Sequence, residues 1–353
     1  MSKSLLLITM TLFCAVSAQA ADPLSNQSSV SRRALELMSA QVARAGDRLV
    51  SVGERGTVLL SDDEGRSWRQ VVAPVRLTLT SLCFADSRLG WAVGHGGVVL
   101  ATKDGGESWA RQLDGRTVAE IEMAQAKSDL ARTPQDERAQ SRVREAEGLV
   151  KDGPDKPFLG AYCFDTTHVL IVGAYGLAFR TADGGASWQS AMGDTDNPHG
   201  RHLYAISRTG NDVYVVGEQG IVLKSDNSGA NFHHLDTPAK GTFFGVVTAP
   251  HGTIIALGLR GALYRSSDAG ANWDRLAMPL ASLTAGRRLT DGRLMLADEA
   301  GHLWQSSDDG KSFAETGLPD GAAISSIEQA DGDALVLSGM VGNRRIALTE
   351  TRK

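Results

Sequence analysis

The chain of 353 residues carries a net charge of −5 at pH 7, so its overall charge gives no reason to expect a nucleic-acid partner. Its three cysteines do not have the paired spacing of a metal site. Glycine is abundant, at 39 residues, which suits a fold with many tight turns.

The first twenty residues are typical of a signal peptide. Lys3 provides a positive start, residues 5–16 form an apolar run, and Ala18-Gln19-Ala20 fits a cleavage site. We therefore predict cleavage near Ala20 and a mature protein, residues 21–353, that is periplasmic or secreted. No later stretch reaches about 18 uninterrupted apolar residues, so we predict no transmembrane segment.

One motif, Ser-x-Asp-x-Gly-x-Ser-Trp, recurs along the chain. The residues at its third position are Asp63, Asp104, Asp183, Asn227, Asp268 and Asp308. The copies are about 40 residues apart, except that Asp104 and Asp183 are separated by nearly twice that spacing. A period of this length with strand-like flanks is typical of a four-stranded propeller blade.

The second repeat illustrates the strands that we expect in every blade. They span Thr80 to Ala85, Trp91 to Gly94, Val98 to Thr102 and Ser108 to Gln112. Apolar runs separated by Gly, Asp and Asn are hairpin signals, so each blade should be an antiparallel sheet.

A second turn recurs seven times. It reads Gly-x-x-Gly at residues 53–56, 94–97, 173–176, 217–220, 258–261 and 339–342, and begins with Asp298 in the copy at 298–301. We therefore predict an all-β fold, a seven-bladed β-propeller. The seventh blade has a third strand at Arg345 to Thr349 and no outer strand after it. Because an open strand edge invites aggregation, we expect Val30 to Leu35 to supply that outer strand, so that N- and C-terminal strands close the ring.

The long interval contains an insertion between blades two and three, Arg116 to Lys156. Apolar residues recur there at helical spacing, so a helical hairpin is predicted. Thr133 and Pro134 are interpreted as the N-cap and first residue of the second helix, and Gly153-Pro154 as its end.

Cys83 and Cys163 occupy matching places in neighbouring repeats. An exported protein can form a disulfide, but the favoured interpretation is two small buried thiols on separate inner strands.

The repeated Asp motif has a structural explanation. Its carboxylate can accept hydrogen bonds within its own turn, its glycine permits a positive φ, and its aromatic residue packs between blades. Six near-copies cannot all be catalytic, so we assign these residues a structural role and predict no catalytic or metal-binding residue.

The two repeated turns should lie on opposite faces of the propeller. The Asp motif joins strands three and four, whereas the Gly-x-x-Gly turns share the other face with the blade connections and the insertion. Loops on a rigid scaffold commonly carry function. The candidate partner-binding residues on that face are Arg55, Arg76, His95, Tyr175, Arg201, His202, Glu218, Arg260 and Glu299. For any one of them, the alternative is an ordinary solvated loop residue.

The motif copies resemble the Asp boxes of the BNR-repeat superfamily, which includes sialidases. Together with the Gly-x-x-Gly turn they are more similar to the photosystem II stability/assembly factor family. The resemblance implies a non-enzymatic propeller without a cofactor. It also implies a membrane protein complex as the partner, met from the lumenal or periplasmic side, and suggests an RND-type exporter.

Two departures limit the resemblance. The chain has no Arg-Ile-Pro tripeptide of the sialidase kind, and the insertion is not part of the common repeat. A photosystem client therefore does not follow. The alternative function is an Asp-box carbohydrate-active enzyme or lectin, which would need Arg55, Arg260, Tyr175 and Glu218 at the propeller axis.

Overall fold

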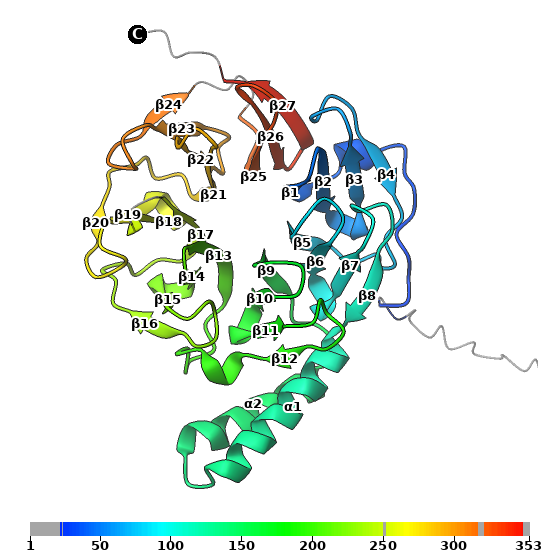
Figure 1. Ribbon diagram of the computed structural model, residues 1–353, viewed down its shortest axis with the longest axis vertical. Coiled ribbons are helices and arrows are strands. Elements are labelled where there is room, and N and C mark those ends of the chain that lie inside the picture. The colour runs from blue at the N-terminus through cyan, green and yellow to red at the C-terminus, as the bar shows by residue number, and fades with distance from the viewer. Residues whose placement is uncertain (1–21, 23, 250–251, 317–320, 349–353) are drawn as a thin grey trace, which may run out of the picture.

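The computed structural model describes residues 22, 24–249, 252–316 and 321–348. Within these residues, seven antiparallel sheets surround a central axis in the order in which they occur in the chain (Figure 1). This is the propeller architecture that the repeat predicts. The expected signal peptide and its cleavage site lie outside the described residues.

The helical insertion lies between sheets two and three. Sheet one consists of β1 (Ser39–Ala45), β2 (Arg48–Gly53), β3 (Val58–Ser61) and β4 (Arg69–Val71). Sheet two consists of β5 (Leu79–Phe84), β6 (Gly90–Gly94), β7 (Val99–Thr102) and β8 (Ala110–Leu113). Sheet three consists of β9 (Phe158–Cys163), β10 (Val169–Gly173), β11 (Ala178–Thr181) and β12 (Gln189–Ser190). The strands of sheet two lie within about two residues of the predicted bounds.

The remaining four sheets complete the ring. Sheet four consists of β13 (Leu203–Thr209), β14 (Asp212–Gly217), β15 (Val222–Ser225) and β16 (His233–Leu235). Sheet five consists of β17 (Phe243–Thr248), β18 (Ile254–Gly258), β19 (Ala262–Ser266) and β20 (Asp274–Arg275). Sheet six consists of β21 (Leu283–Arg288), β22 (Leu294–Asp298), β23 (Leu303–Ser306) and β24 (Ala314–Thr316). Sheet seven has three strands, β25 (Ile324–Gln329), β26 (Ala334–Gly339) and β27 (Gly342–Ala347).

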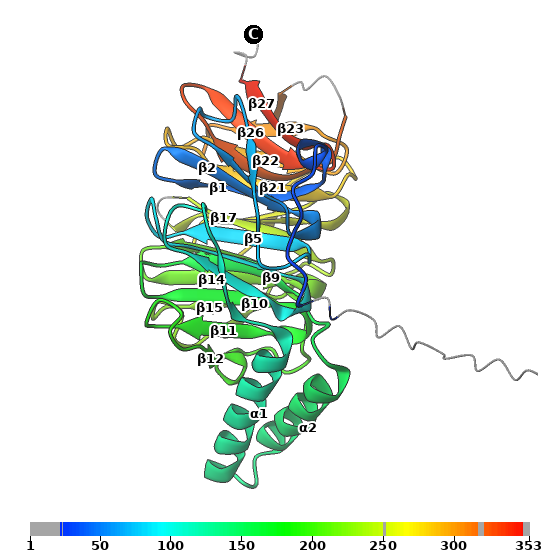
Figure 2. The same cartoon turned by 90° about the vertical axis from the view of Figure 1, so that its right-hand side faces the viewer.

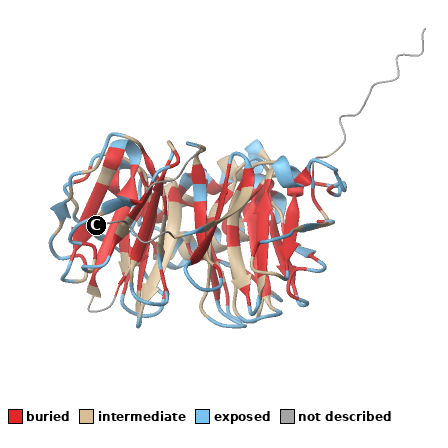
Figure 3. Cartoon of the chain, turned by 90° about the horizontal axis from the view of Figure 1, so that it is seen from above, coloured by how far each residue is buried: buried red, intermediate tan, exposed pale blue. Residues whose placement is uncertain are grey.

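The hydrophobic core lies between neighbouring sheets. One cluster joins Leu170 and Val172 of sheet three to Val213 and Val215 of sheet four, and similar clusters fill the other junctions. Figure 3 shows buried residues along the strands and exposed residues in the turns of both faces. Each sheet is therefore stable only beside its neighbours, which favours a closed ring.

The prediction that Val30 to Leu35 forms an outer strand is wrong. Within the described residues, sheet seven ends at β27, and the N-terminal segment is held elsewhere. The backbone N–H of Ser28 donates to the carbonyl of Ala73 at 2.9 Å, and that of Ser31 donates to the side chain of Gln70 at 2.8 Å. These bonds keep the segment along sheet one, and only the short helix η1 (Ala34–Glu36) approaches the start of β27.

The Asp motif has the structural role that its repetition predicts. In the first copy, the Asp63 carboxylate accepts hydrogen bonds from the Ser61 hydroxyl, at 2.8 Å, and from the backbone and hydroxyl of Ser67, at 2.8 and 2.6 Å. Asn227 makes the first of these bonds and the backbone bond with its amide oxygen, at 2.7 and 3.1 Å. The turn therefore tolerates a neutral residue at this position.

The insertion is a helical hairpin, as predicted. It consists of α1 (Gly115–Arg132) and α2 (Glu137–Asp152), which extend outward from the edge of the ring (Figures 1 and 2). The predicted N-cap is wrong, because the Thr133 N–H donates to Asp129 and closes α1, whereas Asp136 caps α2 by accepting from Arg138 at 2.9 Å. Gly153, with φ of 81°, ends α2 as predicted.

Cys83 and Cys163 form a disulfide between β5 and β9, so the favoured interpretation of two separate thiols is wrong. The innermost strands of sheets two and three run side by side at this point, and their Cα atoms are 5.7 Å apart. The bond closes a loop that contains the whole hairpin, with a sequence separation of 80 residues.

Replacing Cys83 by Ser should lower the free energy of unfolding by about 4 kcal/mol, because the bond restricts the unfolded chain across a long loop. Chemical denaturation measures the difference. A reducing agent should weaken the native protein to the same extent and leave the variant unchanged. An unaltered denaturation midpoint in the variant would contradict the expectation.

The Asp motifs should make the protein sensitive to acid. Hydrogen bonds from Ser67 and Ser187 lower the pKa values of Asp63 and Asp183 from 3.8 to about 2. Because the folded pKa is lower than the unfolded one, the stabilisation is present above pH 4 and is lost as the pH falls through about 2. The Asp183→Asn variant should melt below the native protein at pH 7, and the difference should shrink toward pH 2.

The fourth motif offers a matched control for this measurement. In the fourth motif, Asn231 lies four residues after Asn227. In the fifth motif, Asn272 lies four residues after Asp268, and its backbone and side chain donate to the Asp268 carboxylate at 2.9 and 2.7 Å. Asn227→Asp should therefore raise the melting temperature at pH 7 and lose that gain in acid. A gain that persists at pH 2 would argue against the carboxylate as the source.

Candidate functional site

The two repeated turns lie on opposite faces of the ring. In sheet one, Ser39 pairs with Gly53, which places the Gly-x-x-Gly turn at the end where the inner strand begins. Leu49 pairs with Ser61, which places the Asp motif at the other end. The face with the Gly-x-x-Gly turns and the blade connections is called the turn face below, and the opposite one the Asp face.

Four of the nine predicted partner-binding residues come together on the turn face. The ring centroids of Tyr175 and His202 are 4.8 Å apart, and the backbone N–H of His202 donates to the Glu218 carboxylate at 2.9 Å. Arg201 donates to the side chain of Gln219 at 3.1 Å. The Lys156 ammonium, at the base of the hairpin, lies 4.8 Å from the Tyr175 ring centroid. The sequence pointed to these residues but not to Lys156 as their neighbour.

The other five predicted residues are distributed around the same face. Arg55, His95, Arg260 and Glu299 lie in the turns of sheets one, two, five and six, and Arg76 in the connection that follows β4. Glu299 accepts a hydrogen bond from the backbone of Ser282 at 2.9 Å. Glu218 bonds the backbone of His202 in the same way, so both glutamates hold a blade connection in place.

The turn face also carries exposed apolar side chains that the repeat pattern does not predict. Among the described residues, the large hydrophobic side chains that are exposed are Val30, Leu35, Val72, Val150, Tyr175, Leu259, Leu280, Met340 and Val341. Val150 belongs to α2, and the others lie in the N-terminal segment, the Gly-x-x-Gly turns or the blade connections. Single exposed hydrophobics are ordinary, but their restriction to one face and the hairpin indicates a contact surface.

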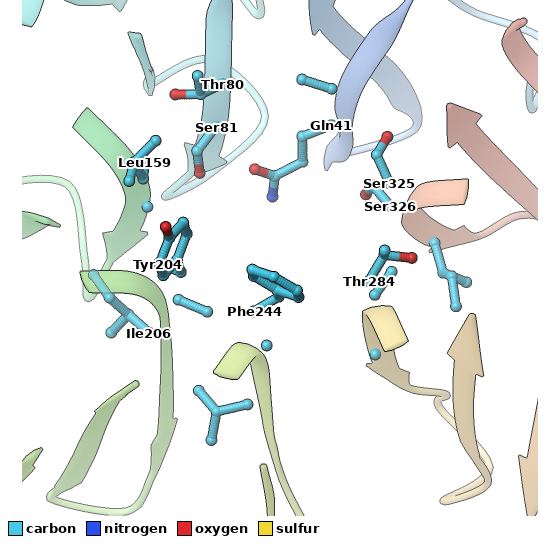
Figure 4. Close-up of a pocket in the computed structure, with 18 of the residues that line it drawn as sticks. Gln41, Thr80, Ser81, Leu159, Tyr204, Ile206, Phe244, Thr284, Ser325 and Ser326 are labelled. Carbon is cyan, nitrogen blue, oxygen red and sulfur yellow. The ribbon is translucent and has the colours of Figure 1, made fainter. Parts of the chain in front are cut away.

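Described residues line at least two cavities along the axis. One, of about 230 Å³, is lined by side chains of the innermost strands that include Gln41, Thr80, Tyr204, Phe244 and Ser325 (Figure 4). Two of these side chains bond between sheets: Thr80 donates to the carbonyl of Phe158 at 2.6 Å, and Ser325 to that of Ser39 at 2.7 Å. Part of this lining therefore serves the ring itself.

The second cavity, of about 710 Å³, lies toward the Asp face. Two arginines of its lining are in ion pairs, Arg44 with Glu64 at 2.6 Å and Arg287 with Glu328 at 2.5 Å. Burial raises the pKa of the Glu328 carboxyl. Arg55, Arg260, Tyr175 and Glu218 line neither cavity, so the axial constellation needed for the carbohydrate alternative is not formed.

A buried ionic network fixes the hairpin to sheet three. Glu122 of α1 is 1% exposed and pairs with Arg142 of α2 at 2.7 Å, while Asp129 pairs with the same guanidinium at 2.6 Å. The hydroxyl of Ser190, in β12, donates to Glu122 as well. The hairpin therefore has one defined orientation on the ring.

Within the described part of the chain, no group of three or more His, Cys, Asp or Glu side chains is placed to hold a metal ion. No helix in that part is both long and apolar enough to cross a membrane.

Comparison with known proteins agrees with the architecture. Residues 155–316 match a family described as photosynthesis system II assembly factor YCF48. A curated relative, the photosystem II assembly lipoprotein Ycf48 of Synechococcus sp. (strain CC9902), is 25% identical over 152 residues, which are 42% of this chain and 45% of the relative. The resemblance to the photosystem II assembly factor family that the sequence predicts is therefore confirmed.

Solved structures show the same fold. A structure of YCF48 bound to D1 peptide has a TM-score of 0.65 and 16% identity, over 90% of this chain and 95% of that one. The GH74 enzyme of Niastella koreensis has a TM-score of 0.59 and 13% identity, over 90% of this chain and 44% of the enzyme. The fold alone thus occurs in both assembly factors and enzymes.

Replacing Glu122 by Gln should loosen the hairpin without unfolding the ring, because Arg142 would lose a buried partner at a cost of about 3 kcal/mol. Hydrogen exchange should accelerate in α1 and α2 and stay slow in β10. The double variant Glu122→Leu/Arg142→Met removes both charges and should restore protection of the hairpin. Unchanged exchange in the single variant would show that the network does not orient the helices.

Proposed function

We propose that this chain, with its resemblance to photosystem II assembly factors, is an exported, non-enzymatic scaffold that assists a membrane protein complex. The observation that carries the proposal is the one-sided distribution of exposed apolar side chains, which lie on the turn face and hairpin. The Asp face instead carries turns whose polar groups bond to one another. A partner would therefore meet the turn face.

Three further observations support the proposal. The disulfide between Cys83 and Cys163 suits an oxidising compartment such as a periplasm or lumen. The matched relative is itself described as an assembly lipoprotein, and a related propeller was solved with a bound peptide. The nine predicted residues, led by the cluster of Tyr175 and His202, form the polar part of the proposed contact. An RND-type exporter is the specific partner that the resemblance suggests.

Removal of the hairpin should abolish capture of the membrane partner. Its two ends are adjacent, because the Pro154 Cα lies 2.6 Å from the position that a Cβ on Gly115 would take. A short Gly-Ser linker in place of residues 116–153 should therefore leave the ring folded. Affinity capture from detergent-solubilised membranes, with quantitative mass spectrometry, should then recover at least tenfold less of the partner.

Lys103→Ser provides a matched control, since Lys103 is an exposed residue of the Asp face. This variant should capture the partner as the native chain does. Equal capture by the hairpin deletion would contradict the proposal, as would recovery of no membrane protein by the native chain.

A further inference from the structure

A groove separates the hairpin from the ring. It is a cavity of about 350 Å³ between α2 and the connection from β12 to β13, and its lining includes Gly148, Leu149, Tyr175, Met192 and Pro198. A smaller cavity of about 60 Å³ shares Tyr175, Met192 and Pro198 and continues it toward Arg142. The larger volume lies at the lower end of the range for small-ligand pockets and is sufficient for a large side chain.

Gly148 keeps this groove open. It lies in the interior of α2, where glycine is less favourable than alanine by about 1 kcal/mol. Within the described residues, a Cβ added to it would meet nothing within 4 Å beyond the backbone of its own helix. No close packing explains the glycine, and the space that its missing side chain leaves is part of the groove.

Tyr175 provides a fixed aromatic wall. It has a φ of 56°, a conformation that is unfavourable for a residue with a side chain, and the residue is still 54% exposed. The Lys156 ammonium and the His202 ring, both at 4.8 Å from its centroid, hold the ring in place. A rigid exposed aromatic ring loses little entropy when a partner packs against it.

The rim of the groove is acidic. Glu145 and Asp152 lie on the same side of α2 as Gly148, three residues before it and four after it. The Lys156 ammonium pairs with Asp152 at 3.0 Å and with Asp155 at 2.8 Å, so its charge is compensated. In the smaller cavity, Arg142 is paired with Glu122 and Asp129, and Arg138 lies 3.9 Å from Asp196. Around the larger cavity, the carboxylates of Glu145, Asp152 and Asp155 thus outnumber the single Lys156 ammonium. The two arginines that line the smaller cavity have carboxylate partners.

We infer that the groove binds an extended segment of the protein partner through one large apolar side chain. A Lys or Arg beside that side chain faces Glu145 and Asp152. The apolar walls select the anchor, and the acidic rim selects its cationic neighbours. This inference rests on the proposed function, because it names the chemistry of the segment that the hairpin and turn face recognise.

Three five-residue peptides test the chemistry on the full mature chain, namely Gly-Lys-Trp-Lys-Gly, Gly-Glu-Trp-Glu-Gly and Gly-Lys-Ala-Lys-Gly. Binding is followed through the NMR signal of the Met192 methyl group, assigned with a Met192→Leu variant. The first peptide should shift that signal with a Kd on the order of 1 mM, as expected for one anchor side chain. The other two should bind at least tenfold more weakly. Similar binding of all three, or no shift with the first, would overturn the inference.

Gly148→Leu blocks the groove while improving the helix propensity of α2, so any loss of binding would not come from a weakened hairpin. The shift with the lysine-tryptophan peptide should disappear in this variant. Ala131→Leu is the matched control, because it adds the same side chain to an exposed position of α1 outside the groove. It should bind as the native chain does, and undiminished binding by Gly148→Leu would overturn the inference.

Capture from membranes separates this inference from the proposed function. Gly148→Leu should reduce recovery of the partner at least threefold, whereas Lys103→Ser on the Asp face should not. Full recovery by Gly148→Leu, with loss by the hairpin deletion, would reject the groove and keep the scaffold. Full recovery by the deletion would reject the scaffold itself, whatever the peptides do.

Discussion

The contact between the first and the last sheet is the constraint on which the rest of the fold depends. No strand is shared across it in the described residues, so side chains close the ring. Val42 and Leu49 of sheet one pack with Val336 of sheet seven. Arg44 donates to the carbonyl of Gln329 at 2.8 Å, and Ser51 to the amide oxygen of Asn343 at 3.1 Å. Because every sheet buries its surface against two neighbours, loss of this contact would expose apolar surface at both ends.

Much of the fold was predictable because the repeated residues interact with neighbours that are close in the sequence. The backbone N–H and hydroxyl of Ser67 donate to the Asp63 carboxylate only four residues away. The spacing of these two residues alone therefore identifies the turn and the strands beside it. The errors concern contacts between distant residues. Cys83 and Cys163 lie in separate repeats, and only the packing of β5 beside β9 brings them together. The closure was missed for the same reason, since the bond from Ser28 to Ala73 follows no periodic pattern.

The sequence predicted which face of the ring carries the candidate residues, but not which of those residues contact other elements. The repeat order placed Arg55, Tyr175 and Arg260 in equivalent turns, and the structure gives all three a φ near 55°. Repetition could not show which of them have neighbours from another element. Tyr175 gained Lys156 from the base of the hairpin and His202 from a blade connection. The exposed Leu280 and Met340 were overlooked because an apolar residue in a loop carries no pattern of its own.

The hairpin is an addition to the seven repeated sheets of the ring. The path of the chain does not require it, since Gly115 and Pro154 already lie side by side. Yet the charge of Glu122 is buried and α2 contains a glycine in its interior. Both features lower the stability of the hairpin, so a purely structural role does not account for them. The first holds the hairpin at one angle to sheet three, and the second leaves room beside Tyr175. Orientation and open space together are the requirements of a docking site.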